Sequence, residues 1–170
     1  IFAGALIILL VVAVFFVMQS SSDKHGKRQF FELFSEIGGG PGGSDMSVLM
    51  QENTVSYGEF IDRLKNGEVN FVWELWAMRA KCPEDQTPDA CDASILTFIS
   101  NRYGNPEKEK LLDLFKKYFQ YEAEMREAGP PSAADFQQKY DFFKKKRREV
   151  MGKDADLVFG MEEAQVDFMG

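Results

Sequence analysis

The chain has 170 residues, 45% of them hydrophobic, and its 27 acidic and 20 basic side chains give a net charge of −7. This acidic surplus argues against nucleic acid as the main partner, because phosphate binding needs a basic face. The length allows one hydrophobic core or several small helical lobes.

The first 18 residues, IFAGALIILLVVAVFFVM, contain no charged or polar side chain. As a helix they are about 27 Å long, close to the roughly 30 Å of a bilayer's hydrocarbon core. The following QSSSD is a poor signal-peptide cleavage site, so we predict an uncleaved transmembrane anchor over residues 1–18 and a polar spacer over residues 19–27. The chain starts at an isoleucine and stops within a predicted helix, so we expect a fragment of a longer protein.

Two helices and an ambiguous segment follow the spacer. Apolar residues at i, i+3, i+4 and i+7 in RQFFELFSEI predict a short helix over residues 28–37, which the Gly-rich GGGPGG ends as a flexible joint. Ser56 and Glu59 have capping-box spacing, and Asn66-Gly67 ends the helix that they begin. VNFVWELWAMRAK fits a strand or a helix, and we predict a helix because no partner strand is recognisable.

Cys82 and Cys91 flank the short segment PEDQTPDA. A pair that closes such a loop is typical of a disulfide in an oxidising compartment, where it adds about 2.5–3 kcal/mol of stability. The alternative is two free thiols in a cytosolic loop. A zinc site needs four ligands and the single histidine, His25, is far away in sequence, so we predict no metal.

The second half of the sequence predicts four more helices and completes an all-α fold. DASILTFISNRYG predicts a helix that starts near Asp92, and the longest helix follows with Asn105 as its cap and Pro106 as its first residue. Ser132 with Asp135 begins the next helix, whose predicted inner side carries Phe136, Tyr140, Phe143, Arg147 and Val150. The last helix opens at Asp154, with apolar positions Leu157, Met161, Ala164 and Phe168.

Motifs for common catalytic chemistry are absent from the sequence. GGGPGG lacks the Lys-Ser/Thr of a phosphate loop, and no Gly-x-Ser-x-Gly nucleophile motif occurs, so we predict neither catalysis nor a cofactor. Glu162 and Glu163 form a carboxylate pair or are two solvated residues early in a helix. The basic run at residues 144–148 has two interpretations. It is a surface that contacts anionic lipid headgroups or an acidic partner, or it is a solvated helix end whose charge interacts favourably with the helix dipole.

The order of three segments resembles the bacterial lipase secretion chaperones, also called lipase-specific foldases. RQFFELFSEIGG resembles the family signature of Arg, two variable residues, Phe-Asp-Tyr and a Leu-Ser-Ala-x-Gly-Glu tail, with Glu32 in place of Asp. Residues 95–125 are similar to a short helix, a proline and a long helix of the family. KKKRREVMGKDADLVFGMEEAQ resembles the segment Leu-Arg-Arg-x-x-(Leu/Phe)-Gly, spacer, Phe-Gly-x-Glu-Glu-Ala, and the matching residues are Arg147, Arg148, Gly152, Phe159, Gly160, Glu162, Glu163 and Ala164.

The resemblance implies a single-pass protein of the bacterial inner membrane whose periplasmic helices embrace a secreted lipase and promote its active fold without ATP. We then expect a first helical lobe over residues 28–104 and an extended helical arm over residues 105–170. The lipase-contacting residues that it implies are Arg28, Phe31, Glu32, Phe34, Ser35, Arg147, Arg148, Phe159, Glu162 and Glu163.

Three other functions stay open. The first is a membrane-tethered helical scaffold with another protein partner. The second is an accessory domain of a membrane AAA protease, because VSYGEFIDRLKNGEV resembles the stretch after the first span of those enzymes. The third is an enzyme whose catalytic domain lies beyond Gly170. The basic residues that follow the span favour a cytoplasmic soluble part on the positive-inside rule, whereas a disulfide favours an oxidising compartment.

Overall fold

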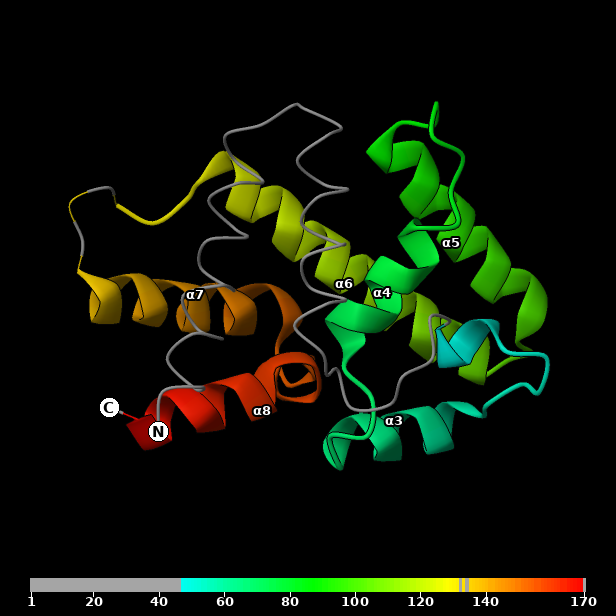
Figure 1. Ribbon diagram of the computed structural model, residues 1–170, viewed down its shortest axis with the longest axis horizontal. Coiled ribbons are helices and arrows are strands. Elements are labelled where there is room, and N and C mark those ends of the chain that lie inside the picture. Colours follow the sequence, from blue (N-terminus) through cyan, green and yellow to red (C-terminus); the bar gives the residue numbers. More distant parts are fainter. Residues whose placement is uncertain (1–46, 132, 134, 170) are drawn as a thin grey trace, which may run out of the picture. The chain divides into compact units, whose positions relative to one another are not determined.

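The computed structural model describes residues 47–131, 133 and 135–169, and every regular element among them is helical (Figure 1). The prediction of an all-α protein is confirmed for these residues. The elements are the 3-10 helix η1 (Val48–Met50) and the α-helices α3 (Tyr57–Lys65), α4 (Phe71–Arg79), α5 (Pro88–Arg102), α6 (Glu107–Glu127), α7 (Phe136–Met151) and α8 (Asp154–Met169).

The predicted anchor, spacer, first helix and Gly-rich joint all fall within residues 1–46, outside the described part of the chain. Among the residues that are described, no helix combines the length and the apolar character needed to cross a membrane.

Side-chain caps explain where α3 and α4 begin. Ser56 Oγ accepts a hydrogen bond from the Glu59 amide at 3.2 Å, as predicted, but the Glu59 carboxylate pairs with Arg63 and does not complete the capping box. Asn70 Oδ1 accepts from the Trp73 amide at 3.1 Å and starts α4. The ambiguous segment is therefore a helix, and the prediction for it is confirmed.

The next two helices start at residues that differ from those predicted. α5 begins at Pro88 instead of near Asp92, because Thr87 Oγ1 accepts from the Ala90 amide at 3.3 Å and proline occupies the first turn. Pro106 is the N-cap of α6 and not its first helical residue. The Asn105 side chain donates to Glu109 Oε1 at 2.9 Å and does not cap the helix.

Aromatic and aliphatic side chains from α3, α4, α5 and α6 form the core. The Phe71 ring of α4 lies 4.8 Å from Phe115 and 5.2 Å from Tyr118 of α6, measured between ring centroids. Burial of rings of this size dominates the stability of a small helical unit. Fully buried side chains come from all six α-helices and include Phe60, Leu75, Ile99, Leu111, Met125, Met151 and Ala155.

The helices after Gly104 pack back onto those before it. Residues 41–170 form one compact unit, in which α6 contacts α5 and α7 while α8 contacts α3, α4 and α7 (Figure 1). The boundary at residue 104 and the extended arm over residues 105–170 stay predictions. The tight turn after α7 brings α8 back against α3 and α4.

The buried face of α8 differs from the predicted one. Ala155, Val158 and Phe159 are buried, whereas Met161 is 51% and Phe168 91% exposed. Of the residues predicted to share one side of α7, Phe136 is 50% exposed, while Tyr140 and Arg147 are buried. The apolar pattern of α8 was misleading because the inner face also carries the charged residue Glu163, which is 4% exposed.

Candidate functional site

Residues 144–164, which carry the most specific part of the family likeness, form the α7–α8 hairpin. α7 starts with a complete capping box, in which Asp135 and Gln138 each bond the other's backbone amide. It ends at Gly152, whose φ of 59° and ψ of −132° favour glycine. Only Lys153 separates this turn from α8, so the end of α7 and the first turns of α8 lie close together.

Arg147 is the centre of the hairpin. Its Nη2 donates to Glu162 Oε1 at 2.9 Å and its Nη1 donates to Glu163 Oε1 at 3.3 Å. Its guanidinium carbon lies 3.9 Å from the centroid of the Phe159 ring, a cation–π distance. Burial disfavours the charged form of Arg147, but the neighbouring Glu162 and Tyr121 together outweigh it, so the pKa of Arg147 is raised above its ordinary value.

Arg148 closes the cluster from the solvent side. Its Nη2 donates to Glu163 Oε2 at 2.7 Å and to Asp156 Oδ1 at 2.8 Å, and its Nη1 donates to Glu163 Oε1 at 3.1 Å. The buried Glu163 carboxylate therefore accepts from two arginines at once. We name Arg147, Arg148, Phe159, Glu162 and Glu163 the hairpin cluster.

Aromatic rings connect the hairpin cluster to α6. Phe159 stacks on Tyr118, with centroids 6.0 Å apart, and meets Tyr121 edge-on at 5.4 Å. Because Tyr118 also contacts Phe71 of α4, the cluster is joined to the core through a continuous set of rings. A change in the hairpin is thus transmitted to the packing of α6.

The basic run before the turn is largely neutralised within the chain. Lys144 pairs with Asp167 at 2.8 Å, and Lys146 pairs with Glu124 at 3.5 Å. Lys145 Nζ lies 3.7 Å from the Glu149 carboxylate. The interpretation of the run as a solvated helix end is wrong for Arg147, which is 7% exposed. The interpretation of Glu163 as a solvated residue is also wrong, because Glu163 is 4% exposed.

The structure gathers five of the predicted lipase-contacting residues, namely those of the hairpin cluster, which contact one another. The other five, Arg28, Phe31, Glu32, Phe34 and Ser35, lie outside the described residues. Cys82, in the connection between α4 and α5, forms a disulfide with Cys91 in the first turn of α5.

A second arginine cluster was not foreseen from the sequence. Arg79, at the end of α4, pairs with Asp92 of α5 at 2.7 Å and with Glu122 of α6 at 2.6 Å. Its guanidinium also lies 5.3 Å from the Phe119 centroid. The available signal was a basic residue at the end of the apolar run FVWELWAMR, but the partners are 13 and 43 residues away in sequence.

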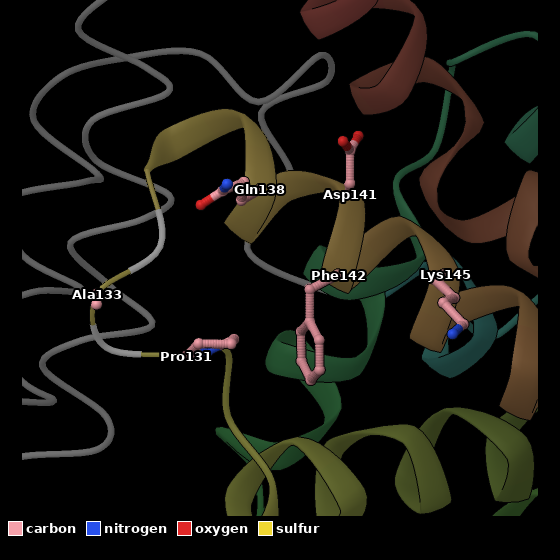
Figure 2. A pocket seen from close by; sticks show the side chains of 6 residues that line it. All are labelled: Pro131, Ala133, Gln138, Asp141, Phe142 and Lys145. Atoms are coloured by element: carbon pink, nitrogen blue, oxygen red, sulfur yellow. The ribbon is translucent and has the colours of Figure 1, made fainter.

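One hollow on the described surface is wide open to solvent, with a volume of about 510 Å³. It lies beside the start of α7 and is lined by Pro131, Ala133, Gln138, Asp141, Phe142 and Lys145 (Figure 2). Figure 2 shows the side chains of Asp141 and Lys145 pointing in different directions, so the two charged groups of the lining do not converge on one point. Among the described residues no group of three His, Cys, Asp or Glu side chains is placed to hold a metal ion.

Comparison of the chain with protein families, with curated proteins and with solved structures gave no match. The chemistry of the site is therefore read from its geometry. The described residues offer a rigid helical surface with internally paired charges and exposed apolar side chains on α7 and α8.

Proposed function

We propose that the chain is a steric folding chaperone, which binds a secreted lipase and promotes its active fold without ATP. The observation that carries the proposal is the hairpin cluster. The five residues that match the most specific family segment are joined in one set of ion pairs and ring contacts. This arrangement gives their types and their spacing a common physical reason, which supports the resemblance.

The cluster acts in this proposal as a support for the binding surface. Arg147 and Glu163 are buried, so they hold the hairpin in shape and do not reach a client directly. The exposed apolar side chains Met161 and Phe168 lie seven residues apart on α8 and offer contacts to a lipase that still exposes apolar surface. Preorganising these side chains reduces the entropy that is lost on binding.

The mechanism requires only a difference in binding energy between two states of the lipase. If the chain binds a near-native state more tightly than a trapped intermediate, the population shifts toward the native fold. If it binds the folding transition state more tightly than the intermediate by about 1.4 kcal/mol, folding accelerates tenfold. No bond is formed or broken, so neither a nucleophile nor a nucleotide is needed.

The proposal includes attachment of the chain to the bacterial inner membrane through residues 1–18, with the helical unit in the periplasm. The Cys82–Cys91 disulfide supports this location, because the periplasm is an oxidising compartment. Within the family expectation the helices form an extended arm, whereas residues 41–170 are compact. We therefore propose that the client binds to the outer surface of the compact unit.

A refolding assay tests the proposal. The full 170-residue chain, purified in detergent micelles, is added without nucleotide to a urea-denatured secreted bacterial lipase that regains little activity alone. We expect the recovered lipase activity to rise at least tenfold over the spontaneous-refolding control. A recovery equal to that control, across several such lipases, would contradict the function.

A pair of variants locates the binding surface. The double variant Met161→Ser and Phe168→Ser is expected to lose most of the gain, because both side chains are largely exposed and contribute little to the core. The matched control is Lys145→Ser on α7, whose side chain is 76% exposed. It should keep the full gain. Equal recovery with the two variants would place the client elsewhere on the chain.

A membrane-tethered scaffold is the second candidate, and the compact packing of residues 41–170 favours it over an embracing arm. The two functions differ in what the partner gains from binding. Pull-down from an envelope extract, followed by identification of the bound protein, separates them. A lipase among the bound proteins supports the chaperone, whereas a stable complex with a folded protein and no effect on its refolding supports the scaffold.

A further inference from the structure

Residues 47–55, which we name the strap, run from η1 to the residue before the cap of α3. The two apolar anchors of the strap are buried, with Leu49 0% and Val55 6% exposed. The strap packs on α4 through η1. Polar side chains on α4 and α5 fasten it at two separate places.

Glu74 of α4 is the first fastener. Its side chain is buried, and its Oε2 accepts a hydrogen bond of 2.5 Å from the hydroxyl of Ser47, which is 1% exposed. The nearby backbone amides of Val48 and Leu49 favour the charged form of this carboxylate and act to lower its pKa. The Ser47 Oγ in turn accepts a hydrogen bond from the Leu49 amide at 3.2 Å. Ser47 therefore links the backbone of η1 to the Glu74 carboxylate.

Arg102, the last residue of α5, is the second fastener. Its Nη2 donates to the carbonyl of Gln51 and, at 3.4 Å, to that of Glu52. Arginine stays charged at every pH at which the protein is folded. The first half of the strap is thus held by Glu74, which titrates, and the second half is held by Arg102, which does not.

We propose that the strap is a proton-linked latch, whose first half is held firmly on α4 while Glu74 is protonated and loosens when Glu74 ionises. Arg102 keeps the second half in place throughout. Loosening uncovers Leu49 and the part of α4 beneath η1. The opening is therefore local and reversible, and it leaves the packing of α5, α6 and α7 intact.

The direction follows from the burial of Glu74. Burial raises its pKa, and this outweighs the opposite effects of the Ser47 hydroxyl, the two amides and the positive charge of Arg63 on α3. Tyr103 lies just after α5, and the pKa of its phenol is raised mainly because the side chain is buried. The charge of Glu74 raises this pKa further. A raised pKa in the docked state means that docking is fully stabilised below the ordinary glutamate pKa. That stabilisation is lost as the pH rises through the raised value.

Amide hydrogen exchange of the full chain, followed by mass spectrometry between pH 4 and pH 8, tests the latch. After correction for the intrinsic pH dependence of exchange, protection of residues 48–50 should fall as the pH rises. The fall amounts to about tenfold for each pH unit that separates the docked and undocked pKa values. Protection of α6 should not change over the same range.

Glu74→Gln keeps the shape and the hydrogen-bonding capacity of the side chain but removes its titration, so protection of the strap should become independent of pH. The matched control is Glu59→Gln on α3, an exposed carboxylate, which should behave as the wild type does. Strap protection that rises with pH in the wild type, or a Glu74→Gln profile equal to the wild-type one, would overturn the latch. If Glu74→Gln does not fold, carbon NMR titration of glutamate carboxyls in the wild type decides. A Glu74 pKa at or below the ordinary glutamate value rejects the proposal.

Discussion

Two helical hairpins in this molecule are fastened by the same kind of arginine, at different depths. In the α4–α5 hairpin, Arg79 bridges Asp92 and Glu122 and lies over the Phe119 ring. The Arg79 side chain keeps 25% of its surface exposed. Its ion pairs are therefore partly hydrated.

In the α7–α8 hairpin, Arg147 bridges Glu162 and Glu163 and lies over the Phe159 ring, at 3.9 Å instead of 5.3 Å. Only 8% of the Arg147 side chain is exposed. Charged groups this far from water are stable only while they are paired, so loss of one partner is far more damaging here than at Arg79.

The connections between the helices differ in the opposite sense. α4 and α5 are separated by residues 80–87 and cross-linked by the Cys82–Cys91 disulfide, whereas Gly152 and Lys153 alone separate α7 from α8. The long α4–α5 connection is restrained by the disulfide, and its arginine, Arg79, is partly exposed. The short α7–α8 connection has no disulfide, and its arginine, Arg147, is buried. We conclude that electrostatics determines the shape of α7–α8, and that it shares this role with the disulfide in α4–α5.

The largest effect is expected from Arg147→Ala. It leaves the buried Glu163 with Arg148 as its remaining partner and removes the cation from the Phe159 ring. Breaking a buried ion pair in this way costs about 3–5 kcal/mol of unfolding free energy. Urea unfolding of the full chain, monitored by far-UV circular dichroism, measures the loss.

The control for Arg147→Ala is Arg126→Ala, which removes an exposed arginine from α6. We expect that change to stay within about 0.5 kcal/mol. A loss for Arg147→Ala no greater than that of the control would mean that the hairpin cluster does not stabilise the fold.

The sequence predicted the helices well where a local signal decides them. Ser56 caps α3 and the Gly152 turn separates α7 from α8, as expected from residue type and spacing alone. Segment 69–81 became a helix because Asn70 caps it, although its apolar pattern alone also fitted a strand. Caps and turns depend on a few neighbouring residues, so they can be recognised without knowledge of the tertiary structure.

The packing of the helices was not predictable in the same way. Glu163 looks like a solvated residue in sequence, and only the position of Arg147 and Arg148 on a neighbouring helix makes its burial favourable. Because the buried face of α8 includes this charge, its apolar positions alone indicated the wrong face. The extended arm was predicted by resemblance and not from residue contacts, whereas the return of α8 follows the short turn at Gly152 and Lys153.

Removal of the disulfide should have the next largest effect. With a sequence separation of 9, the loop-closure entropy predicts that Cys82→Ser with Cys91→Ser lowers the unfolding free energy by about 2.5–3 kcal/mol. The comparison is urea unfolding of this variant against the oxidised wild type. Wild type that has been treated with a reductant is the control and should lose a similar amount. A loss close to zero would show that Arg79 alone holds α4 and α5 together.

The smallest of the three effects is expected from Arg79→Ala, about 1–2 kcal/mol, because the partly exposed carboxylates that it leaves behind are rehydrated. If the disulfide and Arg79 restrain the same hairpin, their effects are not independent. Combining Arg79→Ala with the two serine substitutions should then change stability by about 0.5–1 kcal/mol more or less than the sum of the separate losses. Simple additivity in the urea experiment would mean that the cross-link and the arginine stabilise α4–α5 separately. The disulfide would then not compensate for the shallow position of Arg79.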